Sequence, residues 1–177
     1  MHWDFEEPLD RRGTDSVKWD WKPANRAGTP ILPMWVADMD FPAPSFVQQA
    51  LARRVTHPVY GYTFVPDRLL DAFVSWQGRR NGWEISPEWV VHTPGVMPAV
   101  RAAILAFSEP GDEVVVQPPV YYPFFHAVTD NGRAIVENPL VQTPDGYRMD
   151  LDHLASVVTP RTRLLLLCSP HNPVRSE

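Results

Sequence analysis

From residue 88 onward, short runs of apolar residues alternate with segments that have helical periodicity. The runs are continuously apolar instead of alternating with polar residues, which is typical of strands in a parallel sheet covered on both faces. The expected strands are residues 89–92, 113–116, 133–136 and 164–168, and the expected helices are residues 96–107, 121–129 and 150–158, the last capped by Asp150. This order predicts the α/β fold class, with a mostly parallel sheet flanked by helices.

Two helices are expected before residue 88. Residues 31–40 look extended, and Ser45 is expected to be the N-cap of a helix that runs to about Val55. A second helix is expected from Asp67 to Arg80, ended by Asn81-Gly82. The residues that recur with helical spacing are expected to form its buried face: Leu69, Leu70, Phe73, Val74 and Trp76.

The first 30 residues mix tryptophans with many charged residues and show no lasting period. They form either a disordered tail or an arm that packs on another surface. Disordered segments usually lack large apolar side chains, so the aromatic content favours the arm. The tryptophans that carry this argument are Trp3, Trp19 and Trp21.

The composition limits which binding partners and which cellular compartment we expect for this chain. The formal net charge of −5 gives no reason to expect a nucleic acid or an anionic membrane as partner. Cys168 is the single cysteine, so an internal disulfide is excluded and no oxidising compartment is implied. Residues 1–8 lack the features of a secretory signal, and the longest apolar run, residues 164–168, is too short to span a bilayer. We therefore expect a soluble cytoplasmic protein.

A glycine turn lies at the junction of an expected strand and helix, in residues 93–97. Gly95 lets the backbone turn tightly, and the amides of Val96 and Met97 would lie in the first turn of the helix. Free amides and the helix dipole make such a turn an anion site. An ordinary strand-to-helix turn has the same sequence pattern, so both interpretations stay open at this point.

Two further turns follow buried strands, where ligands bind in open α/β sheets. In residues 117–122, the ring of Tyr121 can stack on a flat heteroaromatic ligand, or the tyrosines can pack in a helix interface. In residues 167–173, the side-chain amide of Asn172 can donate to a ligand oxygen, or Asn-Pro can be a simple turn. Residues 59–62 form either an exposed aromatic loop or a core plug.

The order and spacing of these segments together carry a family resemblance. A glycine turn, an aromatic residue after Pro-Pro, and SPHNP after a leucine-rich strand resemble the large domain of fold type I pyridoxal phosphate enzymes. The opening is similar to the MalY/PatB-like cystathionine β-lyases, with DRRGT at residues 10–14, KWD at 18–20 and LPMWVADMDF at 32–41. VYGY at residues 59–62 fits the same group, so the resemblance extends along the chain to Val174.

The resemblance implies a cofactor site for pyridoxal 5′-phosphate. The backbone at Gly95, Val96 and Met97 would hold the cofactor phosphate. Tyr121 would stack on the pyridine ring, and Asn172 would donate a hydrogen bond to the ring hydroxyl oxygen. These roles agree with the independent interpretations of the three turns as anion site, stacking ring and amide donor.

The resemblance also implies a homodimer and a substrate side. Tyr62 would reach across the dimer interface to the neighbour's cofactor phosphate, and Val36, Ala37 and Asp38 would line the substrate side. Residues 1–40 would be an N-terminal arm with a segment of the small domain, and residues 41–177 an incomplete cofactor-binding large domain. The substrate would be a small S-substituted amino acid such as cystathionine, cleaved by β-elimination into a thiol, pyruvate and ammonia, with the cofactor as electron sink.

The sequence departs from the family pattern after Asn172-Pro173, where a glycine and a long further chain are expected. The acid that pairs with the pyridine nitrogen, the Schiff-base lysine and the arginine that binds the substrate carboxylate are expected downstream, and Lys18 and Lys22 are expected to be solvated surface charges. We therefore expect this polypeptide alone to be inactive as a lyase. A truncated or frameshifted reading frame, a fragment and one piece of a split enzyme are all open, and the missing glycine and the divergent residues 175–177 favour a disrupted frame. An incomplete sheet is expected to leave an unpaired edge and exposed apolar surface.

Three alternatives remain open on the sequence. The first is a pyridoxal phosphate-dependent aminotransferase, because the residues that decide between lyase and transaminase lie partly outside this chain. The second is a non-catalytic interaction or regulatory fragment, since MalY-type relatives also contact a transcriptional activator. The third is a small α/β domain that binds another phosphate ligand at the Gly95 turn.

Overall fold

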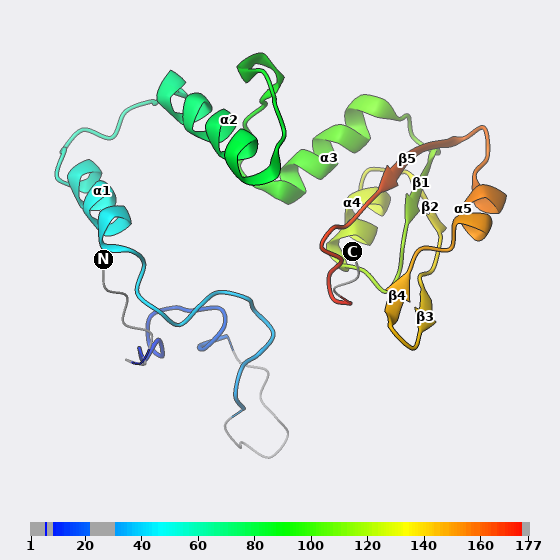
Figure 1. Cartoon of the computed structure of the whole chain (residues 1–177), viewed down its shortest axis with the longest axis horizontal. Coiled ribbons are helices and arrows are strands. Elements are labelled where there is room, and N and C mark those ends of the chain that lie inside the picture. The colour runs from blue at the N-terminus through cyan, green and yellow to red at the C-terminus, as the bar shows by residue number, and fades with distance from the viewer. Residues whose placement is uncertain (1–5, 7–8, 22–30, 175–177) are drawn as a thin grey trace. The chain divides into compact units, whose positions relative to one another are not determined.

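A computed structural model describes residue 6 and residues 9–21 and 31–174. The chain separates into two compact units, within residues 1–65 and 66–177 (Figure 1). The predicted boundary after residue 40 concerns the domains of the whole family fold and stays a prediction. The predictions for Trp3, Lys22 and residues 175–177 lie outside the described residues.

The first unit contains helix α1, Ser45–Val55, with the bounds expected from the sequence. The predicted capping role of Ser45 is wrong, because the N-cap is Pro44 and no side chain caps the helix. Pro44 has extended backbone, and Ser45 already lies in the helix. The apolar residues of α1 are exposed, including Phe46 at 54% and Leu51 at 63%.

Helix α2, Asp67–Asn81, opens the second unit and ends as predicted. Gly82 adopts the left-handed conformation with φ 62°, and the amides of Gly82 and Trp83 return to carbonyls in the last turn. The predicted buried face is wrong, because α2 contains no buried residue among those described. Its spacing is helical, yet Phe73 and Trp76 remain 41% and 52% exposed.

Three parallel strands form a sheet in the order β2-β1-β5 within the described residues. They are β1, Glu113–Val116; β2, Ala134–Glu137; and β5, Thr162–Leu166. The predicted parallel sheet is therefore confirmed. Pairing of β5 stops at Leu166 instead of Cys168, because its partner β1 ends at Val116 and runs into Pro118-Pro119, which have no amide hydrogen for a ladder.

The core lies between the sheet and two helices, α3, Val96–Phe107, and α4, Pro123–Thr129. Its buried cluster consists of Ile104, Val114, Val116, Val120, Phe124, Ala127 and Val128. Helix α5, Leu151–Val157, lies on the other side of β1 and β2 from α4 in Figure 1. The prediction that both faces are covered fails at β5, where Leu165 is 42% exposed.

The predicted strand at residues 89–92 is wrong. Pro87 starts a 3₁₀ turn, η1, Pro87–Trp89, Val90 is extended, and residues 90–92 form no strand. An antiparallel hairpin that was not predicted is formed by β3, Val141–Thr143, and β4, Gly146–Arg148. No helix in the described residues is both long and apolar enough to cross a membrane.

Candidate cofactor site

The turns predicted to bind a ligand adjoin the same core cluster. Parallel strands end at one edge of a sheet, so the segments after β1 and β5 emerge together. Helix α3 precedes β1 and packs along the sheet, and Met97 in its first turn packs against the cluster that contains Val116 and Val120. The helix that begins at the Gly95 turn therefore packs against the same core cluster as the residues that flank Tyr121.

Gly95 forms the N-cap of α3 with φ 155° and ψ 171°, a backbone conformation that residues with a Cβ rarely adopt. No side chain caps α3, and its first turn contains no acidic residue. The amide groups of Val96 and Met97 therefore lie at an uncapped helix N-terminus, where the helix dipole favours an anion. Thr93 fixes the turn from outside through a 2.9 Å hydrogen bond from its hydroxyl to the Gly95 carbonyl.

Tyr121 lies two residues before α4, and 39% of its surface is exposed. Its ring contacts Phe124 edge-on at a centroid distance of 6.1 Å and Tyr122 at 5.8 Å. Phe124 belongs to the core cluster, so the exposed Tyr121 ring rests on a buried neighbour. The alternative in which both tyrosines are packed in a helix interface does not describe this chain, because Tyr122 is 70% exposed.

Asn172 lies in a compact turn after β5. Its backbone amide donates to the Cys168 sulfur at 3.5 Å, and the Cys168 thiol contacts the Pro170 carbonyl at 3.7 Å. The neighbouring His171 is buried, and its Nε2 lies 3.0 Å from the Pro119 carbonyl oxygen. This contact joins the Asn172 turn to the segment that leads into Tyr121.

A buried polar network that the sequence analysis missed lies under the same edge. Gln117, directly after β1, donates from Nε2 to Asn138 Oδ1 at 2.8 Å. Asn138 Nδ2 donates to the Asp150 carbonyl and contacts His153 Nδ1, both at 3.0 Å. Asp150 caps α5 as predicted, accepting from the His153 amide at 2.9 Å. The network connects β1, the loop after β2 and α5, whereas Gln117 Oε1 has no partner among the described residues.

The predicted substrate-side segment, Val36 to Asp38, belongs to the first unit and is held there by the N-terminal arm. Arg11 pairs with the Asp38 carboxylate, and Lys18 donates to the Asp38 carbonyl at 2.9 Å. Lys18 also pairs with Asp40 at 2.7 Å. The prediction that Lys18 is a solvated surface charge is therefore wrong, since its side chain is only 11% exposed.

Asp40 is the residue that joins the arm to this segment. It accepts from Lys18 at 2.7 Å, from the Trp19 indole at 2.8 Å and from Arg11 at 2.9 Å. Hydrogen bonds from Lys18, Trp19 and Arg11 lower the pKa of Asp40 to about 2. Arg11, Lys18 and Trp19 in the described part of the arm therefore contact residues 38–40 of the same chain.

Tyr62 also belongs to the first unit and is fully exposed. The structure therefore groups the predicted residues in two sets. Gly95, Tyr121 and Asn172 belong to the second unit, and the substrate-side segment and Tyr62 belong to the first.

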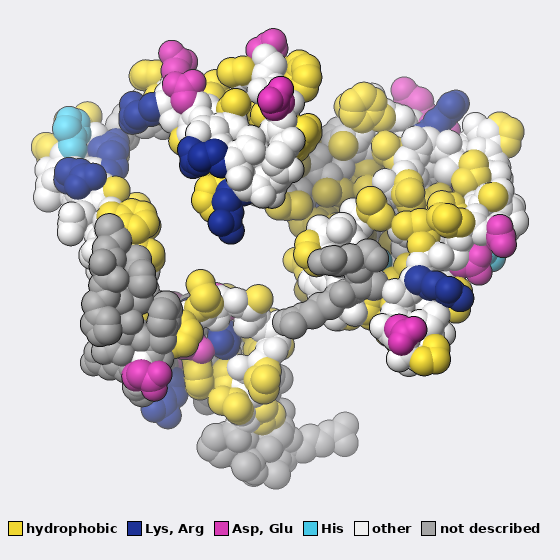
Figure 2. Space-filling model, viewed as in Figure 1, with side chains coloured by type: hydrophobic (Ala, Val, Ile, Leu, Met, Phe, Trp, Pro, Cys, Tyr) yellow, Lys and Arg dark blue, Asp and Glu magenta, His cyan; other side chains and the backbone are white. Residues whose placement is uncertain are grey.

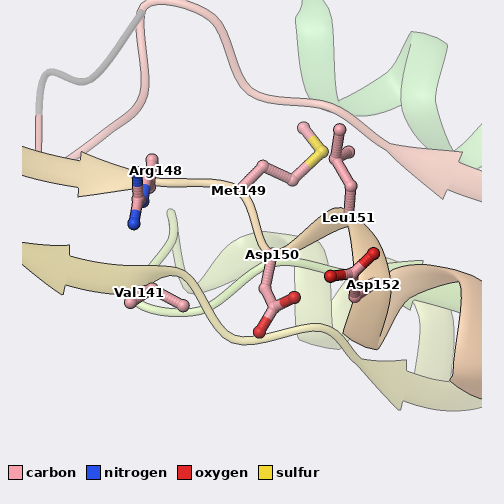
Figure 3. Close-up of a pocket in the computed structure, with 6 residues that line it drawn as sticks. All are labelled: Val141, Arg148, Met149, Asp150, Leu151 and Asp152. Atoms are coloured by element: carbon pink, nitrogen blue, oxygen red, sulfur yellow. The ribbon is translucent and has the colours of Figure 1, made fainter.

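A shallow hollow of about 420 Å³ lies where the β3–β4 hairpin meets α5 (Figure 3). It is lined by Val141, Arg148, Met149, Asp150, Leu151 and Asp152. None of the predicted site residues lines it, and the Asp150 carboxylate already accepts the amide of His153. The hollow is therefore a feature of the hairpin junction and contributes no residue to the candidate cofactor site.

Comparison with known proteins decides the family. Residues 36–174 match the aminotransferase class I and II family. This chain belongs to that family. Cystalysin from Treponema denticola, whose crystal structure contains pyridoxal 5′-phosphate, is similar to it with a TM-score of 0.89 and 34% sequence identity, over 98% of this chain and 45% of cystalysin. The fold is therefore that of fold type I pyridoxal phosphate enzymes, and the predicted fold and family are confirmed.

Curated members of the family are similar along nearly the whole chain. Cystathionine β-lyase PatB from Bacillus subtilis is 46% identical over 170 residues, which cover 96% of this chain and 44% of PatB. Protein MalY from Escherichia coli is 35% identical over 173 residues, which cover 96% of this chain and 44% of MalY. The resemblance to the MalY/PatB-like group is therefore confirmed, and the chain spans less than half the length of these relatives.

Proposed function

We propose that this chain provides the ring- and phosphate-binding part of a pyridoxal phosphate site in a carbon–sulfur β-lyase. Three groups carry the proposal: the uncapped N-terminus of α3, the exposed Tyr121 ring and the Asn172 turn. The 3.0 Å contact of His171 with the Pro119 carbonyl joins the last two, and Met97 in the first turn of α3 packs against the core cluster that contains Val120 and Phe124. Each group suits a different part of a flat, phosphorylated, heteroaromatic molecule. Pyridoxal phosphate, when bound, supplies an electron sink that stabilises negative charge at the substrate α-carbon.

The first turn of α3 fits the phosphate. The amides of Val96 and Met97 are donors without a capping side chain, and Gly95 leaves the approach free of a Cβ. No acidic side chain in this turn repels an anion. In the proposal, this turn fixes the phosphate end of the cofactor.

Tyr121 and Asn172 fit the ring. Tyr121 presents an exposed ring that is supported by Phe124, and stacking on the pyridine would fix the plane of the cofactor. Asn172 is exposed, and its side-chain amide would donate to the ring hydroxyl oxygen. Together these two residues would set the plane and the in-plane rotation of the ring.

The substrate side and the dimer contact are further parts of the proposal. Val36, Ala37 and Asp38 would line the substrate side, held in place by Arg11 and Lys18. The exposed Tyr62 would contribute to the phosphate site of a second subunit. The name of the relative PatB, a cystathionine β-lyase, supports an S-substituted cysteine as substrate and β-elimination to a thiol, pyruvate and ammonia as the reaction of the whole protein.

The binding proposal is tested with 4′-deoxypyridoxine 5′-phosphate, which has the ring and phosphate but no aldehyde that could react with Lys18 or Lys22. Equilibrium dialysis with the full chain should give saturable binding, weakened by Asn172→Ala and by Tyr121→Ala. His57 is an exposed residue of the first unit, and His57→Leu should leave binding unchanged. The proposal fails if the wild-type chain does not bind or if all variants bind equally.

The reaction is tested on the whole protein that contains this chain. Cystathionine should release pyruvate and a thiol without a keto-acid acceptor. The family also contains aminotransferases, and an aminotransferase is the second candidate. That candidate is favoured if product forms only when a keto acid is added and no pyruvate is released.

A further inference from the structure

The segment that leads into Tyr121 contains Pro118-Pro119, which have no amide hydrogen and offer only their carbonyls for backbone hydrogen bonding. The strand ladder of β1 cannot continue through them. Any backbone hydrogen bond that fixes the two prolines must therefore be donated to their carbonyl oxygens. The position of the Tyr121 ring depends on these contacts, because Tyr121 follows two residues after Pro119.

Each carbonyl is reached from a different side of the central strand β1. The amide of Leu140, in the loop after β2, donates to the Pro118 carbonyl at 2.7 Å. The imidazole of His171, in the turn after β5, lies 3.0 Å from the Pro119 carbonyl. The neighbours of β1 in the sheet are β2 and β5, so the segments that follow them hold the proline pair from both sides.

The His171 contact is a defined hydrogen bond. A carbonyl oxygen only accepts, so His171 Nε2 must carry the proton that is donated. The imidazole is 5% exposed, which limits competition from water for the bond. His171 directly precedes Asn172, whose own amide is fixed on Cys168.

We propose that His171 is a positioning residue. Its Nε2–H bond to the Pro119 carbonyl sets the spacing between the Tyr121 ring and the side-chain amide of Asn172. The inference rests on the proposed cofactor function and adds a residue to it. A flat ligand that stacks on one group and accepts from the other needs both at a fixed separation. His171 itself need not touch the ligand.

The test compares two substitutions of His171 in the full chain. His171→Leu fills part of the space without a donor, whereas His171→Gln keeps an N–H group near the position of Nε2. His171→Leu should weaken binding of 4′-deoxypyridoxine 5′-phosphate by about 3- to 10-fold, as expected for one lost buried hydrogen bond. His171→Gln should bind within about 2-fold of wild type, because the donor is retained. His57→Leu is the control for loss of an exposed histidine.

A second readout does not depend on any ligand. Amide hydrogen exchange at Val120 and Asn172 should accelerate several-fold in His171→Leu and stay near wild type in His171→Gln, while Val115 in β1 keeps its protection. The wild-type chain could fail to bind the analogue while amide exchange still accelerates in His171→Leu. In that case the cofactor proposal fails, but the role of the His171–Pro119 hydrogen bond in joining the two turns is supported. Unchanged exchange in His171→Leu, or equal effects of both substitutions, would overturn the inference.

Discussion

Gly95 is the residue at which the backbone conformation and the proposed phosphate site depend on the same feature, the absence of a Cβ. Its φ of 155° is unfavourable for an L side chain, although an added Cβ would meet only Pro98 at an ordinary 3.6 Å. Gly95→Ala should therefore destabilise the second unit through backbone strain, by about 1–3 kcal/mol. Urea unfolding followed by circular dichroism measures this loss.

Gly78 provides the matched control, since it lies within α2 with negative φ and open space around it. Gly78→Ala should stabilise the unit by about 0.5–1 kcal/mol, because alanine has less backbone freedom to lose in a helix. An unfolding midpoint for Gly95→Ala at or above that of wild type would contradict the strain argument.

Asp40 should make the packing of the arm depend on acidity. Its pKa of about 2 lies below the ordinary value of 3.8, because Lys18, Trp19 and Arg11 donate to the charged form. A lowered pKa in the folded state means that the stabilisation is complete above about pH 4 and is lost as pH falls toward 2. The indole N–H resonance of Trp19 should shift with a midpoint near pH 2.

Two substitutions distinguish protonation of Asp40 from general unfolding of the chain in acid. Asp40→Asn should remove the Trp19 step. Asp10→Asn should leave it in place, although the pKa of Asp10 is also about 2, because Asp10 pairs with Arg12 and not with Trp19. Persistence of the step in Asp40→Asn would show that another group controls the arm.

At the scale of elements, Arg133 is a buried cation whose observed partners are a hydroxyl and carbonyls. It donates to the Ser108 hydroxyl at 3.0 Å, to the Ser108 carbonyl, and to the Asn131 carbonyl at 2.6 Å. Ser108 is the C-cap of α3, and Asn131 follows the C-terminus of α4. The guanidinium therefore satisfies carbonyls at two helix C-termini, where the helix dipoles favour a cation.

Arg133→Met should consequently destabilise the second unit by about 2–3 kcal/mol, measured by urea unfolding. Arg101→Met, which removes an exposed ion pair with Asp130, should cost less than about 1 kcal/mol. Equal losses in the two variants would mean that Arg133 acts through surface charge instead of through the helix ends.

The elements that the sequence predicted well are those with strong local signals. Helix α3 and strand β1 have the expected bounds, and Gly82 ends α2 as expected. The hairpin had a usable signal in Pro144-Asp145-Gly146, a turn sequence between two extended stretches. The burial expected for α2 could not be derived from periodicity, because the spacing of apolar residues shows which side is apolar but not what covers it.

The residues of the candidate site also divide into those with a local sequence signal and those without one. Gly95 was proposed from its place before a helix, and Tyr121 and Asn172 were proposed from their places after strands, where open α/β sheets bind ligands. His171 and Gln117 were missed because their partners, Pro119 and Asn138, are fixed by tertiary structure. Pairings of this kind between distant segments have no local pattern in a single sequence.

At the scale of the whole molecule, the chain exposes apolar surface beside a sheet edge. Leu105, Phe107, Leu165 and Leu167 are 56%, 71%, 42% and 60% exposed. Figure 2 shows hydrophobic side chains over α3 and β5. Strand β5 pairs only with β1 among the described strands, so its outer edge is available for pairing with another chain.

Leu165→Lys should therefore reduce self-association in sedimentation experiments and lower binding of an apolar dye, without loss of secondary structure. Leu164→Lys is the matched variant on the opposite face of β5, where Leu164 packs against the core cluster, and it should unfold the unit. If Leu165→Lys leaves association unchanged, another surface drives it.

If the three turns act on one ligand, a titration of the isotope-labelled chain with 4′-deoxypyridoxine 5′-phosphate should perturb all of them together. The backbone amides of Val96 and Met97, the ring of Tyr121 and the side-chain amide of Asn172 should shift together and saturate with one dissociation constant. The account is contradicted if these groups respond with different constants, or if the shifts fall elsewhere in the chain.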